Sequence, residues 1–407
     1  MVVQWKNWKI LTFHIFTNVA KPREHILIGI DIGSTWLRGV VTRQMSNVRY
    51  KEVIATYKLP LEGVDKGNVT DPIVVAETIR ELVNTLENNG GDKPDGILIS
   101  LGGSHIHSTH SNGHTLISRG DGSVSEIDIE KALKDAEKSV FDVKNKMILH
   151  TIPLRFKLDG QEASGNILGL NGHKLEVKAL FITYPKQYFA TLKSALEKTN
   201  LDISDIIAGG IAESVCLLNK KQKMAGTAVV NIGSDTTSLL VYENNLPLLV
   251  SVLPVGGNDI TKDIALGLKI SLEEAEDIKC GNTTLMYSKR RVDEIIEARI
   301  EDICEKINKE LDRIHRKELL PAGLLVLGDT SLLPRIDYMM RYTVKLPVKI
   351  ANNELLPLSN GTLGETSWAR SYGLTFLAPE IKEHVVLGAF FKRITTTLKR
   401  FFVQFLP

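Results

Sequence analysis

Residues 26–41 read I-L-I-G-I-D-I-G-S-T-W-L-R-G-V-V, and this stretch decides the fold. An apolar run leads into the polar turn D-I-G-S-T and returns to an apolar run, which predicts two strands joined by a tight turn. The first strand is too apolar for a surface position, so we expect it to be buried on both faces. Gly33 lets the backbone approach a ligand closely, and the hydroxyls of Ser34 and Thr35 can point at phosphate oxygens. Asp31, at the strand end, could hold Mg²⁺ through water.

The stretch has a second copy later in the chain. Residues 228–241 read A-V-V-N-I-G-S-D-T-T-S-L-L-V, so Asn231 stands where Asp31 stands in the first copy. One such turn is a weak signal, because buried strands often end in Gly-Ser turns. Two copies, each inside an apolar hairpin, predict an internal duplication whose two phosphate-binding loops face one another. The candidate residues of the second loop are Asn231, Gly233, Ser234, Asp235 and Thr236.

A third polar loop follows another apolar strand. Residues 323–327 predict a buried strand that runs directly into the sequence G-D-T-S, with candidate ligand contacts at Gly328, Asp329, Thr330 and Ser331. Between the loops, apolar strands alternate with amphipathic helices, which is typical of an α/β protein. Among the strands that the pattern predicts are residues 174–180, 179–184 and 344–350.

Composition restricts the function classes. The chain has 407 residues, of which 24% are charged and 43% hydrophobic, with a formal net charge of +2. This length allows two or more domains, and the small net charge gives no reason to expect a nucleic-acid partner. Cys216, Cys280 and Cys304 lack metal-binding spacing and even pairing, which fits a reducing compartment. No uninterrupted apolar run approaches the ~20 residues that a membrane-spanning helix needs.

A histidine-rich segment lies near the start of a compact α+β block at residues 102–178. His105, His107, His110 and His114 have spacings that a metal site could use. The alternation of the first two fits one face of an exposed strand, and no cysteine or carboxylate lies among the four. We therefore expect no metal site in this segment.

The last residues predict an in-plane membrane anchor. At 100° per residue, apolar side chains of residues 387–407 share one face, basic side chains lie opposite, and no acidic residue follows Glu383. A core-docking helix is the alternative, but a basic far side with several phenylalanines favours a lipid surface. Burying each phenylalanine contributes about 1.5–3 kcal/mol, and each basic residue near anionic lipid about 1 kcal/mol. The candidate membrane contacts are Phe390, Phe391, Lys392, Arg393, Ile394, Leu398, Lys399, Arg400, Phe401, Phe402 and Phe405.

The three loops, in this order, resemble those of the superfamily that contains actin and the sugar kinases. That resemblance implies an α/β, actin-like ATPase fold, with two duplicated lobes around a nucleotide cleft and an inserted α+β subdomain in the first lobe. It also implies ATP and Mg²⁺ as cofactors, with the first two loops on the phosphates and the third against the adenosine.

Within this superfamily the chain resembles the FtsA family over residues 26–405. The motifs are G-V-D-K-G-N-V-T-D, S-L-G-G-S-H-I, S-V-S-E-I-D-I, P-V-G-G-N-D-I-T-K-D-I-A and A-E-D-I-K, which begin at Gly63, Ser100, Ser123, Pro254 and Ala275. The resemblance implies that Glu276 and Lys279 face the ribose and base. It implies a cell division protein that forms filaments with itself and binds the C-terminal tail of FtsZ and other division proteins. It would tether FtsZ filaments to anionic lipid on the cytoplasmic face of the membrane at the division site.

Three features depart from the family pattern. The second loop begins with Asn231 instead of aspartate, and a neutral amide cannot help to hold Mg²⁺ or orient a water through charge. Asp329 stands where the third loop usually has glycine, and the segment between Lys279 and Val292 is short, which implies a reduced outer subdomain in the second lobe. We therefore expect ATP binding with at most weak hydrolysis.

Two alternatives share the fold. A PilM-like pilus assembly ATPase binds a partner peptide and needs no lipid tail. A small-molecule kinase needs an aspartate base in the cleft, and Asn231 occupies one obvious place for it. The predicted division of the chain is 1–24 (extension), 25–101 (first lobe), 102–178 (insertion), 179–225 (first lobe), 226–378 (second lobe), 379–386 (linker) and 387–407 (amphipathic helix).

Overall fold

The computed structural model describes residues 24–45, 51–91, 93–140, 145–282, 287–352 and 366–377. Nearly all of the predicted N-terminal extension, the linker and the predicted amphipathic helix lie outside these ranges. Within them, no helix combines the length and the apolar character that crossing a bilayer requires.

The first-lobe sheet has five strands in the order β11–β6–β1–β2–β3. The predicted hairpin is present: β1 pairs antiparallel with β2, and β6 lies parallel to β1 on its other side. Ile28 and Ile30 in β1 are fully buried, which confirms that this strand is covered on both faces. The strands are β1 (Glu24–Ile32), β2 (Trp36–Met45), β3 (Glu52–Pro60), β6 (Gly96–Leu101) and β11 (Ile203–Ala208); a small separate hairpin consists of β4 (Val64–Asp65) and β5 (Asn68–Val69).

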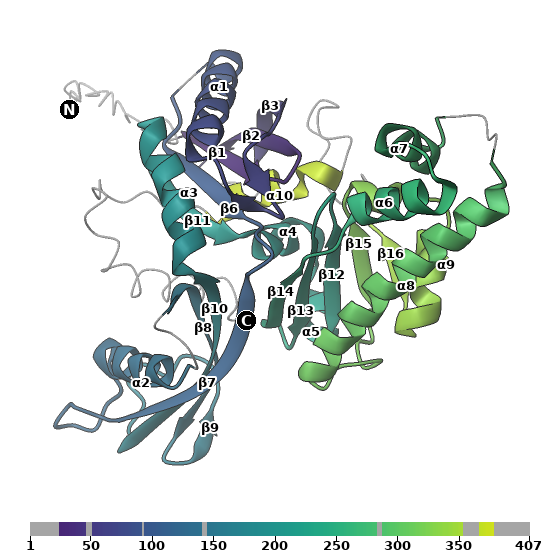
Figure 1. Ribbon diagram of the computed structural model, residues 1–407. Helices are drawn as coiled ribbons and strands as arrows, with labels where there is room; N and C mark the ends of the chain where they lie inside the picture. Colours follow the sequence, from purple (N-terminus) through teal and green to yellow (C-terminus); the bar gives the residue numbers. More distant parts are fainter. Residues whose placement is uncertain are drawn as a thin grey trace, which may run out of the picture.

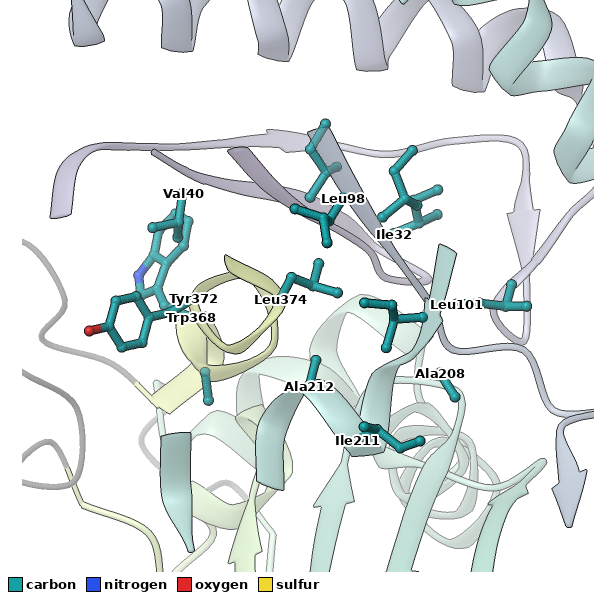
Figure 2. Packing of buried hydrophobic residues seen from close by; sticks show 14 of the residues in the cluster. Ile32, Val40, Leu98, Leu101, Ala208, Ile211, Ala212, Trp368, Tyr372 and Leu374 are labelled. Atoms are coloured by element: carbon teal, nitrogen blue, oxygen red, sulfur yellow. The ribbon is translucent and has the colours of Figure 1, made fainter. Parts of the chain in front are cut away.

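Helices cover both faces of this sheet. Helix α1 (Pro72–Gly90) and α3 (Lys186–Thr199) pack on one face, and α10 (Ala369–Phe376) packs on the other (Figures 1 and 2). Asp71 caps α1 by accepting hydrogen bonds from two backbone N–H groups, and Gly91 ends the helix with φ of 77°. Figure 2 shows Leu374 of α10 between the sheet residues Leu98 and Leu101 and the helix residue Ala212.

The second lobe repeats the first. Its part of the larger, nine-stranded sheet has the order β16–β15–β12–β13–β14, with β15 parallel to β12 and the next two pairings antiparallel. This order matches β11–β6–β1–β2–β3 strand for strand, so the internal duplication predicted from the two hairpins is confirmed in the topology. The strands are β12 (Thr227–Ile232), β13 (Thr237–Glu243), β14 (Leu246–Leu253), β15 (Leu324–Leu327) and β16 (Val348–Ile350).

The second-lobe helices are α5 (Lys220–Ala225), α6 (Gly257–Leu268), α7 (Leu272–Cys280), α8 (Lys289–Arg313) and α9 (Ile336–Val344). The last helix corrects the prediction of a strand over residues 344–350, because Val344 is the final residue of α9 and the strand β16 begins only at Val348. Ile336, Met340 and Val344 form its buried face at a spacing of four residues, while Tyr338 and Tyr342 are exposed. In the first lobe, strand β11 ends at Ala208, and α4 (Gly209–Leu217) begins at once.

The insertion consists of β7 (His107–Leu116), α2 (Glu126–Lys138), β8 (Lys146–Leu158), β9 (Gln161–Ala163) and β10 (Lys174–Pro185). The strands predicted separately over 174–180 and 179–184 are one strand, β10, because a bulge between Lys178 and Ala179 preserves its pairing with β8. Strand β7 meets the edge strand β14 of the second lobe at Ser251 and His107. The insertion therefore continues the second-lobe sheet, although it interrupts the sequence of the first lobe (Figure 1).

Candidate functional site

The two predicted phosphate loops have the same turn geometry and touch each other. Gly33 N donates to Trp36 O at 3.1 Å, and Gly233 N donates to Thr236 O at 2.9 Å. Between the loops, Thr35 Oγ1 donates to Ser234 Oγ at 2.9 Å. The loops therefore face one another, and their hydroxyl groups are in direct contact.

The third loop closes against the second. After β15 the chain forms a short 3₁₀ turn, Asp329–Leu332, from which Thr330 Oγ1 donates to Gly233 O at 3.2 Å. The N-terminus of α6 also uses the second loop, because Gly257 N donates to Gly233 O and Asn258 N donates to Ser234 O. The orphan N–H groups of this helix thus find protein carbonyls as partners. Asp235, from the same loop, accepts from Asn258 Nδ2 at 2.8 Å.

An ion pair joins the third loop to the first lobe. Arg38 in β2 lies 3.1 Å from a carboxylate oxygen of Asp329. The side chain of Arg38 is 12% exposed and that of Asp329 is 61% exposed, so this pair borders solvent. The acidic residue that departs from the family pattern therefore has a basic partner on the opposite lobe.

Glu276 and Lys279, predicted to face the nucleoside, bind each other beside this third loop. Lys279 Nζ lies 2.6 Å from Glu276 Oε2 and donates to Gly257 O at 3.3 Å, while Thr261 Oγ1 donates to the same glutamate oxygen. Partial burial opposes ionisation of Glu276, but the hydrogen bonds from Lys279 and Thr261 outweigh it and lower the pKa of the carboxyl group. The pair carries opposite charges next to the N-terminus of α6.

A buried arginine at the centre of the site was not predicted. Arg370 in α10 places Nη2 at 2.6 Å and Nε at 2.7 Å from Glu213 Oε1. Its Nη1 lies 3.4 Å from Asp31 Oδ1, and Ser100 Oγ donates to that same oxygen. The signal in the sequence is one charged residue within a helix whose buried residues are Ala369, Ser371, Tyr372, Gly373, Leu374 and Thr375.

Glu213 extends this network to the second lobe. It is fully buried in α4, and its Oε1 also accepts a 2.5 Å hydrogen bond from Asn231 Nδ2, while Oε2 has no hydrogen-bond partner among the described residues. Burial raises the pKa of Glu213, although Arg370 and Asn231 oppose that shift. Burial also disfavours the charge of Arg370, but Glu213 and Asp31 outweigh it and raise the pKa of the guanidinium, which stays protonated.

This arrangement does not fit Mg²⁺ at Asp31. The carboxylate already receives the guanidinium of Arg370 and the hydroxyl of Ser100. Asn231 directs its amide N–H₂, a hydrogen-bond donor, toward the carboxylate of Glu213. Magnesium instead needs oxygen ligands in near-ideal octahedral geometry. Within the part of the chain that the structure describes, no three histidine, cysteine, aspartate or glutamate side chains form a group that could hold a metal, and this includes the histidine-rich segment.

Asn231→Asp, which restores the acidic residue of the family pattern, should destabilise the protein by about 2–3 kcal/mol. The substitution exchanges a donor that binds buried Glu213 for a second carboxylate, so a hydrogen bond is lost and two like charges meet. Urea unfolding at neutral pH measures the change. Asn231→Ser is the control, because it removes the amide without adding charge and should cost less. A variant as stable as the parent would contradict the expectation.

The family model described as "Cell division protein FtsA" matches residues 228–373, and the model for the SHS2 domain inserted in FtsA matches residues 103–183. The chain belongs to the FtsA family. Cell division protein FtsA of Pseudomonas aeruginosa is 24% identical, covering 80% of this chain and 82% of that relative. FtsA of Bacillus subtilis is 26% identical, covering 80% of this chain and 78% of that relative.

Solved structures show the fold that this family shares more widely. A PilM–PilN type IV pilus biogenesis complex superposes with a TM-score of 0.66 at 18% identity, covering 87% of this chain and 99% of that chain. The ethanolamine utilization protein EutJ of Carboxydothermus hydrogenoformans gives a TM-score of 0.50 at 16% identity, covering 87% of this chain and 90% of its own. At these identities the likeness concerns fold alone, and the actin-like α/β architecture predicted from the sequence is confirmed.

Proposed function

We propose that this member of the FtsA family tethers the division machinery to the membrane. It polymerises, binds FtsZ filaments, and holds them on the inner face of the cytoplasmic membrane through residues 387–407. The observation that carries the proposal is the pairing of an FtsA-type body with a C-terminal sequence whose one face is apolar and whose other face is basic. A pilus assembly protein needs no such tail, and the fold likeness to PilM does not distinguish the two.

ATP is the ligand that we propose for the cleft. Three loops with small polar residues converge there, and Lys279 lies beside them. Two hydroxyls 2.9 Å apart leave no room for a phosphate group between them, so nucleotide binding requires Thr35 and Ser234 to separate. With Asn231 in place of an acidic residue, we propose binding with at most slow turnover.

The C-terminal tail of FtsZ is the protein partner that we propose. By resemblance to the family, it would bind the outer part of the second lobe. In the described residues this part consists of α6, α7 and the first turns of α8, without a strand between them. Arg299 in α8 joins this helix to α6 through two hydrogen bonds to Asp263, at 2.6 and 2.9 Å. The bidentate contact gives the proposed docking region a defined shape.

Flotation with vesicles tests the tether. We expect the full chain to float with vesicles that contain phosphatidylglycerol. A chain ending at Lys382 should remain in the dense bottom fraction of the gradient. Phe391→Ser/Phe402→Ser should lose most of the flotation, because each buried phenylalanine contributes about 1.5–3 kcal/mol. The matched control is Thr396→Ser in the same segment, which should float like the parent. Equal flotation of the full and truncated chains would refute the tether.

A further inference from the structure

We infer that this chain supplies its own cation to the cleft: the guanidinium of Arg370 binds the carboxylate predicted to hold Mg²⁺, so the two lobes close without a divalent cation or a nucleotide. The inference concerns the cleft, and it stands independently of the proposed membrane tether.

The guanidinium of Arg370 and a divalent cation would compete for Asp31. This carboxylate lies at the end of β1, is 5% exposed, and has Arg370 Nη1 at 3.4 Å and Ser100 Oγ at 2.5 Å from the same oxygen. A buried carboxylate that is paired with a guanidinium already has a compensating charge. A divalent cation would have to displace this guanidinium from a buried position.

The network of hydrogen bonds and ion pairs around Arg370 connects the two lobes. Asp31 and Arg370 belong to the first-lobe sheet and its covering helix, while Asn231 and Ser238 belong to the second-lobe hairpin. The connection passes from Asp31 to Arg370, then to Glu213 and on to Asn231, and Arg370 Nη2 also lies 3.5 Å from Ser238 Oγ. The guanidinium is therefore the positive charge at the centre of the contact between the two duplicated halves.

Glycines surround the side chain of Arg370 at positions where a larger residue would collide with it. A Cβ atom at Gly209 would lie 2.6 Å from Arg370 Nε, and one at Gly102 would lie 3.1 Å from Nη1. Helix α10 itself meets α4 so closely that a Cβ atom at Gly373 would lie 1.9 Å from Ala212 O. The guanidinium is thus held between the carboxylates, with little space to swing aside for another cation.

A disulfide across the cleft reports closure directly. The hydroxyl oxygens of Thr35 and Ser234 are 2.9 Å apart, so cysteines at these two positions can form a disulfide only while the loops are in contact. In the full-length Thr35→Cys/Ser234→Cys protein, we expect the disulfide to form in EDTA without nucleotide. Adding Mg²⁺ alone should leave its rate unchanged. Mass spectrometry of the cross-linked peptide pair separates this disulfide from any that involves the native cysteines.

A second arm tests the arginine. Arg370→Gln/Glu213→Gln removes both charges but retains polar side chains, and in the double-cysteine background it should slow the cross-link about tenfold or more. Arg299→Gln, which breaks the Arg299–Asp263 ion pair within the second lobe, is the matched control and should leave the rate unchanged. Cross-linking that requires Mg²⁺ or nucleotide, or a rate that survives Arg370→Gln/Glu213→Gln, would overturn the inference. If the charge variant does not fold, the first arm still tests the inference, because cross-linking that requires Mg²⁺ or nucleotide would overturn it.

Discussion

Gly373→Ala should destabilise the protein by about 3 kcal/mol, the upper end of the usual cost of overpacking. The added Cβ atom would lie 1.9 Å from the backbone oxygen of Ala212, and a backbone atom in a packed helix cannot move aside as a side chain end can. Alanine is favoured over glycine by about 1 kcal/mol inside a helix, so the steric cost exceeds a favourable propensity. Urea unfolding followed by circular dichroism measures the loss.

Gly210→Ala is the matched control for this substitution. Gly210 lies in α4, the helix that Gly373 contacts, and its added Cβ atom would lie 3.4 Å from Leu240 Cβ, an ordinary packing distance. We expect this variant to be as stable as the parent, or up to about 1 kcal/mol more stable. Equal stability of the Gly373 and Gly210 variants would show that α10 and α4 do not pack as closely as the structure indicates.

Arg370→Ala should cost about 3–5 kcal/mol, the usual result of removing one partner from a buried ion pair. The substitution leaves Glu213, which is fully buried, and Asp31, which is 5% exposed, without their guanidinium. Both the free energy of unfolding and the midpoint of thermal unfolding should fall. The loss should be smaller in acid, because protonation of Glu213, whose pKa burial already raises, removes one of the two uncompensated charges.

Arg370→Ala/Glu213→Ala separates the charge effect from a packing effect. Once both partners are removed, the uncompensated glutamate is gone, so this double variant should be more stable than Arg370→Ala alone. If the two substitutions instead add their separate costs, the arginine contributes through packing and its charge has little importance.

The sequence predicted the duplicated hairpins and their contact because that information is local and repeated. Strand length, an apolar run and a Gly-Ser turn are all visible within residues 26–41 and again within 228–241. The ends of helix α1 carry local signals of the same kind, since Asp71 and Pro72 stand at its start and Gly91 at its end. Two such copies were enough to predict that the loops face one another.

The residues that link the loops could not be read in the same way. Arg370 and Asp31 meet only through tertiary packing, from opposite ends of the chain. Glu213 lies in α4, which begins at Gly209, and the packing of this helix buries the side chain completely. Helix α9 was missed because it is only 9 residues long and two exposed tyrosines, Tyr338 and Tyr342, lie between its buried positions. Local propensity does not contain these contacts.

The insertion is fastened to both lobes at once. Strand β10 leads directly into α3, which packs against α1 in the first lobe, while its neighbour β7 is joined to β14 of the second lobe at Ser251 and His107 (Figure 1). Any rotation that parts the lobes must therefore shear this short junction or swing the whole insertion with it. In the second case the whole insertion rotates with the lobe. A small separation of the turns at Gly33 and Gly233 then produces a larger displacement at the distant end of the insertion, around β9.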